Sequence, residues 1–158
     1  RQRQMCIRDS LDDAQCALMG ARAVYDGPVL ISLVPNEEGM LSGGRTLSEG
    51  VALCDEYGAD VIGVVSDAPA RVLVGFAKEM ASVTDKPLLV DVSVRRKDRR
   101  QFEPTDENPY PTADAIVELA VRLRAQGVQF LRASGAATPA YTGALLATVG
   151  GSDVVVPQ

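Results

Sequence analysis

The chain has 158 residues, of which 46% are hydrophobic and 23% charged, as expected for one globular domain or part of one. This composition excludes a disordered or collagen-like chain. The 16 basic and 21 acidic residues give a net charge of −5, which argues against binding to nucleic acid or anionic lipid. Four Tyr, three Phe and no Trp also argue against a stacking surface for single-stranded nucleic acid. No apolar run approaches the roughly 20 residues that span a membrane.

Histidine is absent and cysteine is scarce. Without histidine, every mechanism that needs an imidazole base, proton shuttle or metal ligand is excluded. The three cysteines, Cys6, Cys16 and Cys54, form no CxxC pair and no even-numbered framework. They are typical of reduced thiols, so we expect a cytoplasmic protein and not a disulfide scaffold or a zinc ribbon.

Residues 1–10 differ from the rest of the chain. They are rich in arginine and glutamine, show no apolar periodicity, and lack the apolar core of a signal peptide. We interpret them as a translated sequencing or cloning scar; the alternative is a disordered basic arm. The expected domain is therefore residues 11–158, a partial barrel domain as argued below.

From residue 11 onward, helical and strand patterns alternate. Apolar spacing predicts helices at 11–25, 46–57, 69–83, 112–126 and from 138 to near the end. The helix at 46–57 has a capping box, with Thr46 at the cap and Glu49 three residues on. Continuous apolar, β-branched runs predict buried strands at 29–34, 60–65, 87–92 and 128–131.

This alternation predicts an α/β fold made of parallel βα repeats with right-handed crossovers. A complete (β/α)8 barrel, or TIM barrel, takes about 250 residues. The four βα units predicted here are therefore half of a TIM barrel.

Four stretches resemble the homocysteine S-methyltransferase family, which includes betaine–homocysteine methyltransferase and the homocysteine-binding domain of cobalamin-dependent methionine synthase. Residues 59–66 (ADVIGVVS) resemble the family strand GAD-x-x-G-V-N-C, and residues 84–90 (TDKPLLV) resemble T-x-x-P-L-x-x-Y-P-N-A-G. Residues 108–112 (NPYPT) lie at the family's Pro-containing turn, and residues 126–139 lie over A-G-A-x-x-x-G-G-C-C-G-T-T-P. The resemblance implies the second half of a TIM barrel, strands five to eight.

The resemblance also implies a zinc site, and at this site the sequence departs from the family. Family members bind Zn²⁺ through one Cys after the sixth strand and a Cys pair after the eighth, and the metal activates homocysteine as a thiolate. The matching positions here are Ser66, Ser134 and Gly135. Serine hydroxyls bind zinc far worse than thiolates, and glycine supplies no side-chain ligand. Cys16 and Cys54 fall within predicted outer helices, so we expect no metal and no cofactor.

Other polar residues follow the predicted strands, at the end of a barrel where active sites lie. The rim candidates for ligand binding are Asn36, Glu37, Asp67, Asp91, Ser93, Arg95 and Arg96. Carboxylates that converge there would bind a hard cation or act as acid and base; the alternative is solvated loop ends and helix caps. The basic run 95–100 suggests an anion clamp for a carboxylate or phosphate, or else a solvated polar loop.

Two functions follow. The first is a partial homocysteine S-methyltransferase-like domain, a diverged methyltransferase fragment that is inactive alone because its thiolate ligands are absent. The second is a non-catalytic pseudoenzyme half-barrel that binds a small amino-acid-like ligand or pairs with another subunit. A half-barrel exposes sheet edges and apolar surface, so we expect a homodimer or pairing with the missing N-terminal half of the barrel.

Overall fold

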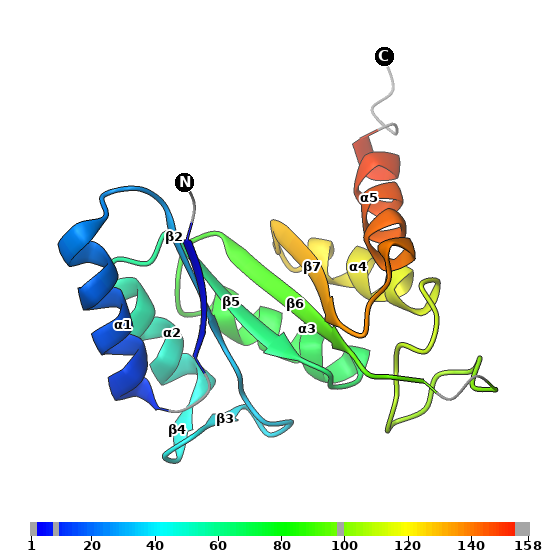
Figure 1. The fold of residues 1–158 in the computed structure, drawn as a ribbon, viewed down its shortest axis with the longest axis horizontal. Coiled ribbons are helices and arrows are strands. Elements are labelled where there is room, and N and C mark those ends of the chain that lie inside the picture. The colour runs from blue at the N-terminus through cyan, green and yellow to red at the C-terminus, as the bar shows by residue number, and fades with distance from the viewer. Residues whose placement is uncertain (1–2, 8–9, 98–99, 154–158) are drawn as a thin grey trace.

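A computed structural model describes residues 3–7, 10–97 and 100–153 of the chain. A parallel sheet forms its centre (Figure 1). The strands of this sheet are β1 (Arg3–Ile7), β2 (Val29–Leu33), β5 (Val61–Ser66), β6 (Leu88–Val94) and β7 (Phe130–Gly135). The helices are α1 (Leu11–Val24), α2 (Leu47–Glu56), α3 (Ala70–Ala81), α4 (Ala115–Ala125) and α5 (Pro139–Asp153).

The strands lie in the order β1-β2-β5-β6-β7, and every neighbouring pair is parallel. A helix joins each strand to the next, and successive helices pack against each other from α1 to α5. This is the arrangement of consecutive βα units in a barrel. The sheet is not closed, because β1 and β7 are its outer strands in the part of the chain that the structure describes.

The expected helices and the four strands from residue 29 onward are present, with two additions. Residues 3–7, which the sequence analysis left out of the fold, form β1 and pair with β2. A short antiparallel hairpin of β3 (Met40–Leu41) and β4 (Arg45–Thr46) precedes α2. The capping box at the start of α2 is confirmed, since Thr46 accepts from the Glu49 N–H and the Glu49 carboxylate accepts from the Thr46 N–H.

The prediction for the last strand was wrong at both ends. We expected residues 128–131, whereas β7 is Phe130–Gly135. The strand continues through the polar residues Arg132 and Ser134 because β6 extends to Val94 and supplies paired backbone as far as Gly135. The prediction relied on a continuous apolar run, which ends before Arg132, whereas the rest of β7 alternates between polar and apolar side chains.

One face of the sheet forms the main core against the helices. Alternate strand residues such as Ile31, Ile62 and Val90 are fully buried there, packed with Leu73 of α3 and Leu119 of α4. Period-two alternation places their neighbours on the other face, where Leu30, Val61 and Leu89 form a separate small cluster. We call these the covered face and the open face.

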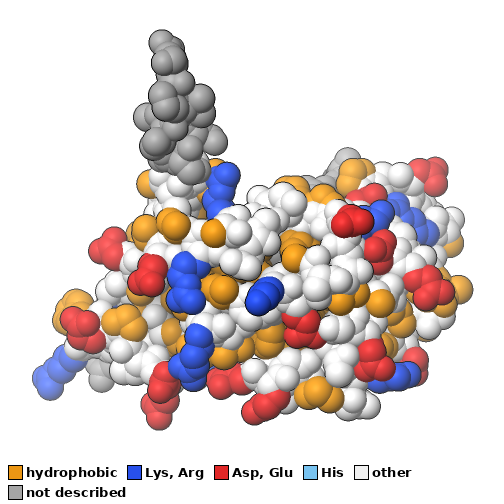
Figure 2. All heavy atoms as spheres, turned by 180° about the vertical axis from the view of Figure 1, so that it is seen from behind, with side chains coloured by type: hydrophobic (Ala, Val, Ile, Leu, Met, Phe, Trp, Pro, Cys, Tyr) orange, Lys and Arg blue, Asp and Glu red, His pale blue; other side chains and the backbone are white. Residues whose placement is uncertain are grey.

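The surface seen from behind carries charged side chains of both signs between apolar ones (Figure 2). No single-sign field therefore dominates this side of the molecule. Within the described ranges, no helix combines the length and apolar character needed to cross a bilayer.

Candidate functional site at the carboxyl ends of the strands

The carboxyl ends of the parallel strands lie at one edge of the sheet, toward the bottom of Figure 1. The loops that leave this edge run from β5 to α3, from β6 to α4 and from β7 to α5. The longest of them, between β6 and α4, is tied down by hydrogen bonds among its own residues, such as that from the Asn108 N–H to Thr105 Oγ1 at 3.0 Å. Every candidate residue predicted from the sequence lies at or near this edge.

Ser66 and Ser134 end strands on either side of β6. Ser66 pairs with Val92 and Ser134 with Ser93, so the two serines lie at nearly the same height, roughly 10 Å apart across two strand spacings. Because Val92 and Ser93 are consecutive, the serines point to opposite faces of the sheet. Ser66 is on the covered face, where its hydroxyl accepts a hydrogen bond from the Ala68 N–H at 3.2 Å.

Gly135 follows Ser134 with a positive φ of +70°, a conformation that side chains other than glycine rarely adopt. A Cβ there would lie 2.6 Å from the Val94 carbonyl oxygen and 3.2 Å from Ser93 Oγ. A cysteine at this position would therefore be strained, because its Cβ would crowd the neighbouring strand.

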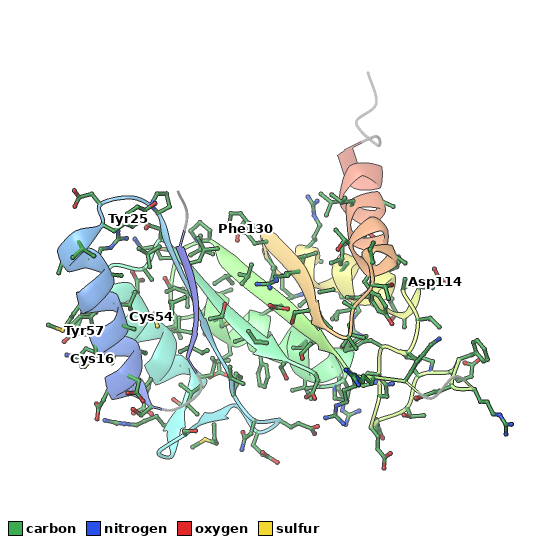
Figure 3. The ribbon with its side chains drawn as sticks, in the orientation of Figure 1. Cys16, Tyr25, Cys54, Tyr57, Asp114 and Phe130 are labelled. Atoms are coloured by element: carbon green, nitrogen blue, oxygen red, sulfur yellow. The ribbon has the colours of Figure 1, made fainter. Side chains whose placement is uncertain are left out.

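These three positions do not fit a zinc ion. The Ser66 hydroxyl already accepts a hydrogen bond from the Ala68 N–H on the covered face, whereas Ser134 lies on the open face. Gly135 offers no side-chain ligand. Elsewhere in the described residues, no group of three or more His, Cys, Asp or Glu side chains is placed to hold a metal. Cys16 and Cys54 lie on α1 and α2, across the molecule from β7 (Figure 3). Burial raises the pKa of the Cys54 thiol to about 12, so it stays protonated.

A charged cluster occupies the rim between the loops after β5 and β6. The Arg95 guanidinium donates from Nε to Asp67 Oδ2 at 2.6 Å and from Nη1 to the Glu107 carbonyl oxygen at 2.5 Å. The hydrogen bond with Asp67 and the charges of Asp67, Glu37 and Glu107 raise the pKa of Arg95. The structure thus brings together three predicted rim residues, Glu37, Asp67 and Arg95.

A second polar group lies on the open face. Asp91 is 2% exposed, and its Oδ2 lies 3.4 Å from Nε of Arg132, its register partner on β7. Asp91 Oδ1 has no hydrogen-bond partner among the described residues. The next pair on this face is Ser93 and Ser134, so a strip of polar side chains runs up β6 and β7 to the rim.

The remaining candidates differ in role. The Asn36 side chain closes the turn before β3, because its Oδ1 accepts from the Met40 N–H at 2.8 Å. This contact gives Asn36 a structural role in the turn. Arg96 is exposed and makes no hydrogen bond or ion pair with any residue that the structure describes.

Sequence reasoning missed two tyrosines that tie the rim loops together. The Tyr141 hydroxyl donates to the Tyr110 carbonyl oxygen at 2.9 Å, and the Tyr110 hydroxyl donates to the Ala68 carbonyl oxygen at 2.9 Å. Burial raises the pKa of both phenols, so they stay neutral donors. These bonds join the loops after β5 and β6 to α5. The Pro-Tyr-Pro sequence at 109–111 was the one available signal, since prolines on both sides restrict the backbone at Tyr110.

Comparison with known proteins identifies the fold. No protein-family model and no curated protein matches the sequence. Among solved structures, the apo form of the homocysteine methyltransferase MmuM from Escherichia coli matches with a TM-score of 0.70 and 16% identity over 92% of this chain and 48% of that one. A putative deoxyribose-phosphate aldolase from Toxoplasma gondii matches with a TM-score of 0.58 and 16% identity over 97% and 71%. A Schiff-base-forming fructose-1,6-bisphosphate aldolase matches with a TM-score of 0.53 and 12% identity, over 96% of this chain and 57% of that one.

These likenesses show a TIM-barrel-like α/β fold. The chain spans about half the length of the homocysteine methyltransferase. At 16% identity and below, the comparisons show the fold alone.

Proposed function

We propose that the chain is a homocysteine-methyltransferase-type half-barrel that binds a small amino-acid-like ligand at its rim and does not perform zinc-dependent methyl transfer. The observation that carries this proposal is the make-up of the strand ends. Hydroxyls and a glycine stand where the resemblance puts the zinc thiolates, beside a rim cluster of carboxylates and guanidinium groups.

The absence of methyl transfer follows from the chemistry of the thiol acceptor. A thiol becomes a strong nucleophile at neutral pH when a metal or another positive group lowers its pKa. Ser66, Ser134 and Gly135 supply no thiolate, and Gly135 has no space for a side chain. We therefore propose that the chain needs no metal or cofactor.

The rim cluster suits a zwitterion. Arg95 and its neighbour Arg96 offer guanidinium groups that bind a carboxylate through paired hydrogen bonds, and Asp67 and Glu37 offer acceptors for an ammonium group. A free amino acid or one of its derivatives carries both of these groups.

The likeness to aldolases suggests Schiff-base chemistry as another function, but the positions of the lysines do not favour it. A Schiff base needs a lysine amine at the reacting carbonyl. Lys78 lies on α3, and Lys86 precedes β6 at the opposite edge of the sheet. Lys97 follows β6, but its Nζ lies over the Phe102 ring, 5.1 Å from the centroid.

Subunit pairing is a second candidate, favoured by the free edge of β7. No strand in the described part of the chain pairs with this edge, and Phe130 beside it is 41% exposed (Figure 3). Leu146 of α5, 66% exposed, lines the same hollow of about 420 Å³. An unpaired edge with apolar surface favours association with a second copy or with the other half of a barrel. Sedimentation over a range of protein concentrations tests this: a monomer at every concentration would exclude self-association. Among the described side chains, Cys16 and Cys54 are free thiols, which supports a cytoplasmic location.

The proposal is tested by zinc content and by calorimetry. After dialysis of the full chain against Zn²⁺ with homocysteine, elemental analysis should find much less than one zinc per chain. The Cys16→Ser variant controls for metal held by the exposed thiol. Stoichiometric zinc that persists in this variant would overturn the proposal.

For the ligand, homocysteine and common amino acids are titrated into the wild type and the Arg95→Gln variant. Binding should weaken by about tenfold or more in the variant, because a charge-assisted contact is lost. Arg124→Gln, on α4 away from the rim, is the matched control and should bind as the wild type does. Circular dichroism checks that each variant is folded. Equal affinity in all three proteins, or no binding to the wild type, would contradict the proposed site.

A further inference from the structure

Beside the rim cluster, a cavity of about 490 Å³ lies between the loop after β6 and the start of α5. This volume falls within the range of small-molecule sites. Its polar lining consists of Arg95, Arg96, Lys97, Thr112, Thr138 and Tyr141. None of the described residues that line it is acidic, although the chain as a whole has a net charge of −5.

Two of the three cations are available to a ligand. Arg95 is held by Asp67 at 2.6 Å, which offsets its charge. Arg96 has no hydrogen-bond or ion-pair partner among the described residues, and the Lys97 ammonium makes only a face contact with Phe102. Two adjacent cations without a carboxylate partner among the described residues, at a hollow whose described lining holds no acid, create a local positive potential.

Neutral donors of the lining add to this potential. Thr138 precedes α5 and Thr112 precedes α4, so a threonine from each of two loops lines the same hollow. Ala140, also in the lining, is the second residue of the 15-residue helix α5, and its N–H has no acceptor within the helix. The positive end of that helix therefore faces the cavity as well.

We propose that this cavity binds the phosphate group of a small phosphorylated molecule. A phosphate presents several oxygen acceptors and up to two charges, which two cations, two hydroxyls and a helix N–H can share. A lone carboxylate has two oxygens and one charge. In TIM barrels, phosphate groups frequently bind at the loops after the last two strands, and this cavity lies between the loops after β6 and β7. The site goes beyond the proposed amino-acid-like ligand, with which it shares Arg95 and Arg96.

The test uses inorganic phosphate and glycerol 3-phosphate as probes, with acetate as the carboxylate arm, at constant ionic strength. Calorimetry on the full chain should detect binding of both phosphates and much weaker binding of acetate. In the Arg96→Gln/Lys97→Gln variant the dissociation constant for phosphate should rise by at least about tenfold, because two charge-assisted contacts are lost. The matched control is Arg124→Gln/Lys78→Gln, which removes the same two charge types from α4 and α3 and should bind as the wild type does.

Three results would overturn the phosphate site: no binding of either phosphate, acetate binding as tightly as phosphate, or equal weakening in the two double variants. Both variants change exposed side chains, and circular dichroism confirms that they fold. The result is separable from the proposed function. Amino-acid binding by the wild type without any phosphate binding would overturn this inference alone, whereas phosphate binding without any amino-acid binding would overturn the proposed function alone.

Discussion

The covered and open faces of the sheet differ in what they require of the sequence. Apart from Ser66 at its rim, the covered face is apolar and packs against helices α1 to α5, so its side chains are specified by volume and burial. The open face carries a small apolar cluster and then a polar strip, from Asp91 and Arg132 to Ser93 and Ser134 at the rim. A buried polar group without a hydrogen-bond partner, such as Asp91 Oδ1 within the described residues, costs free energy. The apolar core therefore lies on one face of this sheet, whereas the polar side chains gather on the other face and at its rim.

The largest loss of stability is expected from a substitution in the covered face. Ile62→Ala removes a fully buried side chain near the start of β5 and leaves a cavity in the core. We expect a loss of about 2–5 kcal/mol in the free energy of unfolding. Chemical denaturation measures it. Val121→Ala, at a position 56% exposed on α4, is the control and should change stability by no more than about 0.5 kcal/mol. Similar losses in the two variants would contradict the view that this face carries the stability.

A smaller effect is expected at the rim, at Gly135. In Gly135→Ala the alanine must adopt φ near +70°, and its Cβ must approach the Val94 carbonyl oxygen. The left-handed backbone alone costs about 1–2 kcal/mol. Gly143→Ala in α5 has open space around its Cβ and should instead stabilise the helix by about 0.5–1 kcal/mol. Thermal unfolding should therefore shift in opposite directions for the two substitutions. A neutral Gly135→Ala would mean that this position tolerates a side chain, and the argument against a cysteine there would fail.

Sequence patterns predicted the covered face well, because burial against helices imposes the periodicity that they detect. The capping box at Thr46 and Glu49 was predicted for a similar reason: both partners lie within one turn. Long-range polar contacts carry no such local signal. The pairing of Asp91 with Arg132 depends on the register between β6 and β7, and the extension of β7 depends on the length of its neighbour.

The rim shows the same division. Its residues were predicted as members of loops that follow strands, a placement that topology decides. Their partners were not predicted, because the contacts of Arg95 with Asp67 and of Tyr110 with Ala68 span 28 and 42 residues. Only the folded chain brings these groups together.

The smallest loss of stability is expected at Asp60, a polar residue that connects α1 to the sheet. Asp60 accepts a hydrogen bond from the Val29 N–H at 2.7 Å and pairs with Arg22 of α1 at 2.6 Å, and these contacts lower its pKa. A carboxylate whose pKa is lowered in the folded state contributes stability above its unfolded pKa of about 3.9, and this is lost as pH falls through the folded value. Its side chain is 47% exposed, so solvent limits the contribution to about 1 kcal/mol or less.

Asp60→Asn keeps an acceptor for the Val29 N–H but removes the charge that Arg22 meets. The variant should be less stable than the wild type by about 0.5–1 kcal/mol at neutral pH, and the difference should vanish in strong acid, where the wild-type carboxylate is protonated. Asp106→Asn is the matched control, because Asp106 is 88% exposed and only 3.4 Å from Arg71, and it should show no pH-dependent difference. Urea titrations at several pH values measure both variants. A deficit for Asp60→Asn that persisted in acid would show that the amide itself disturbs the contact, and the charge would then contribute nothing to holding α1 on the sheet.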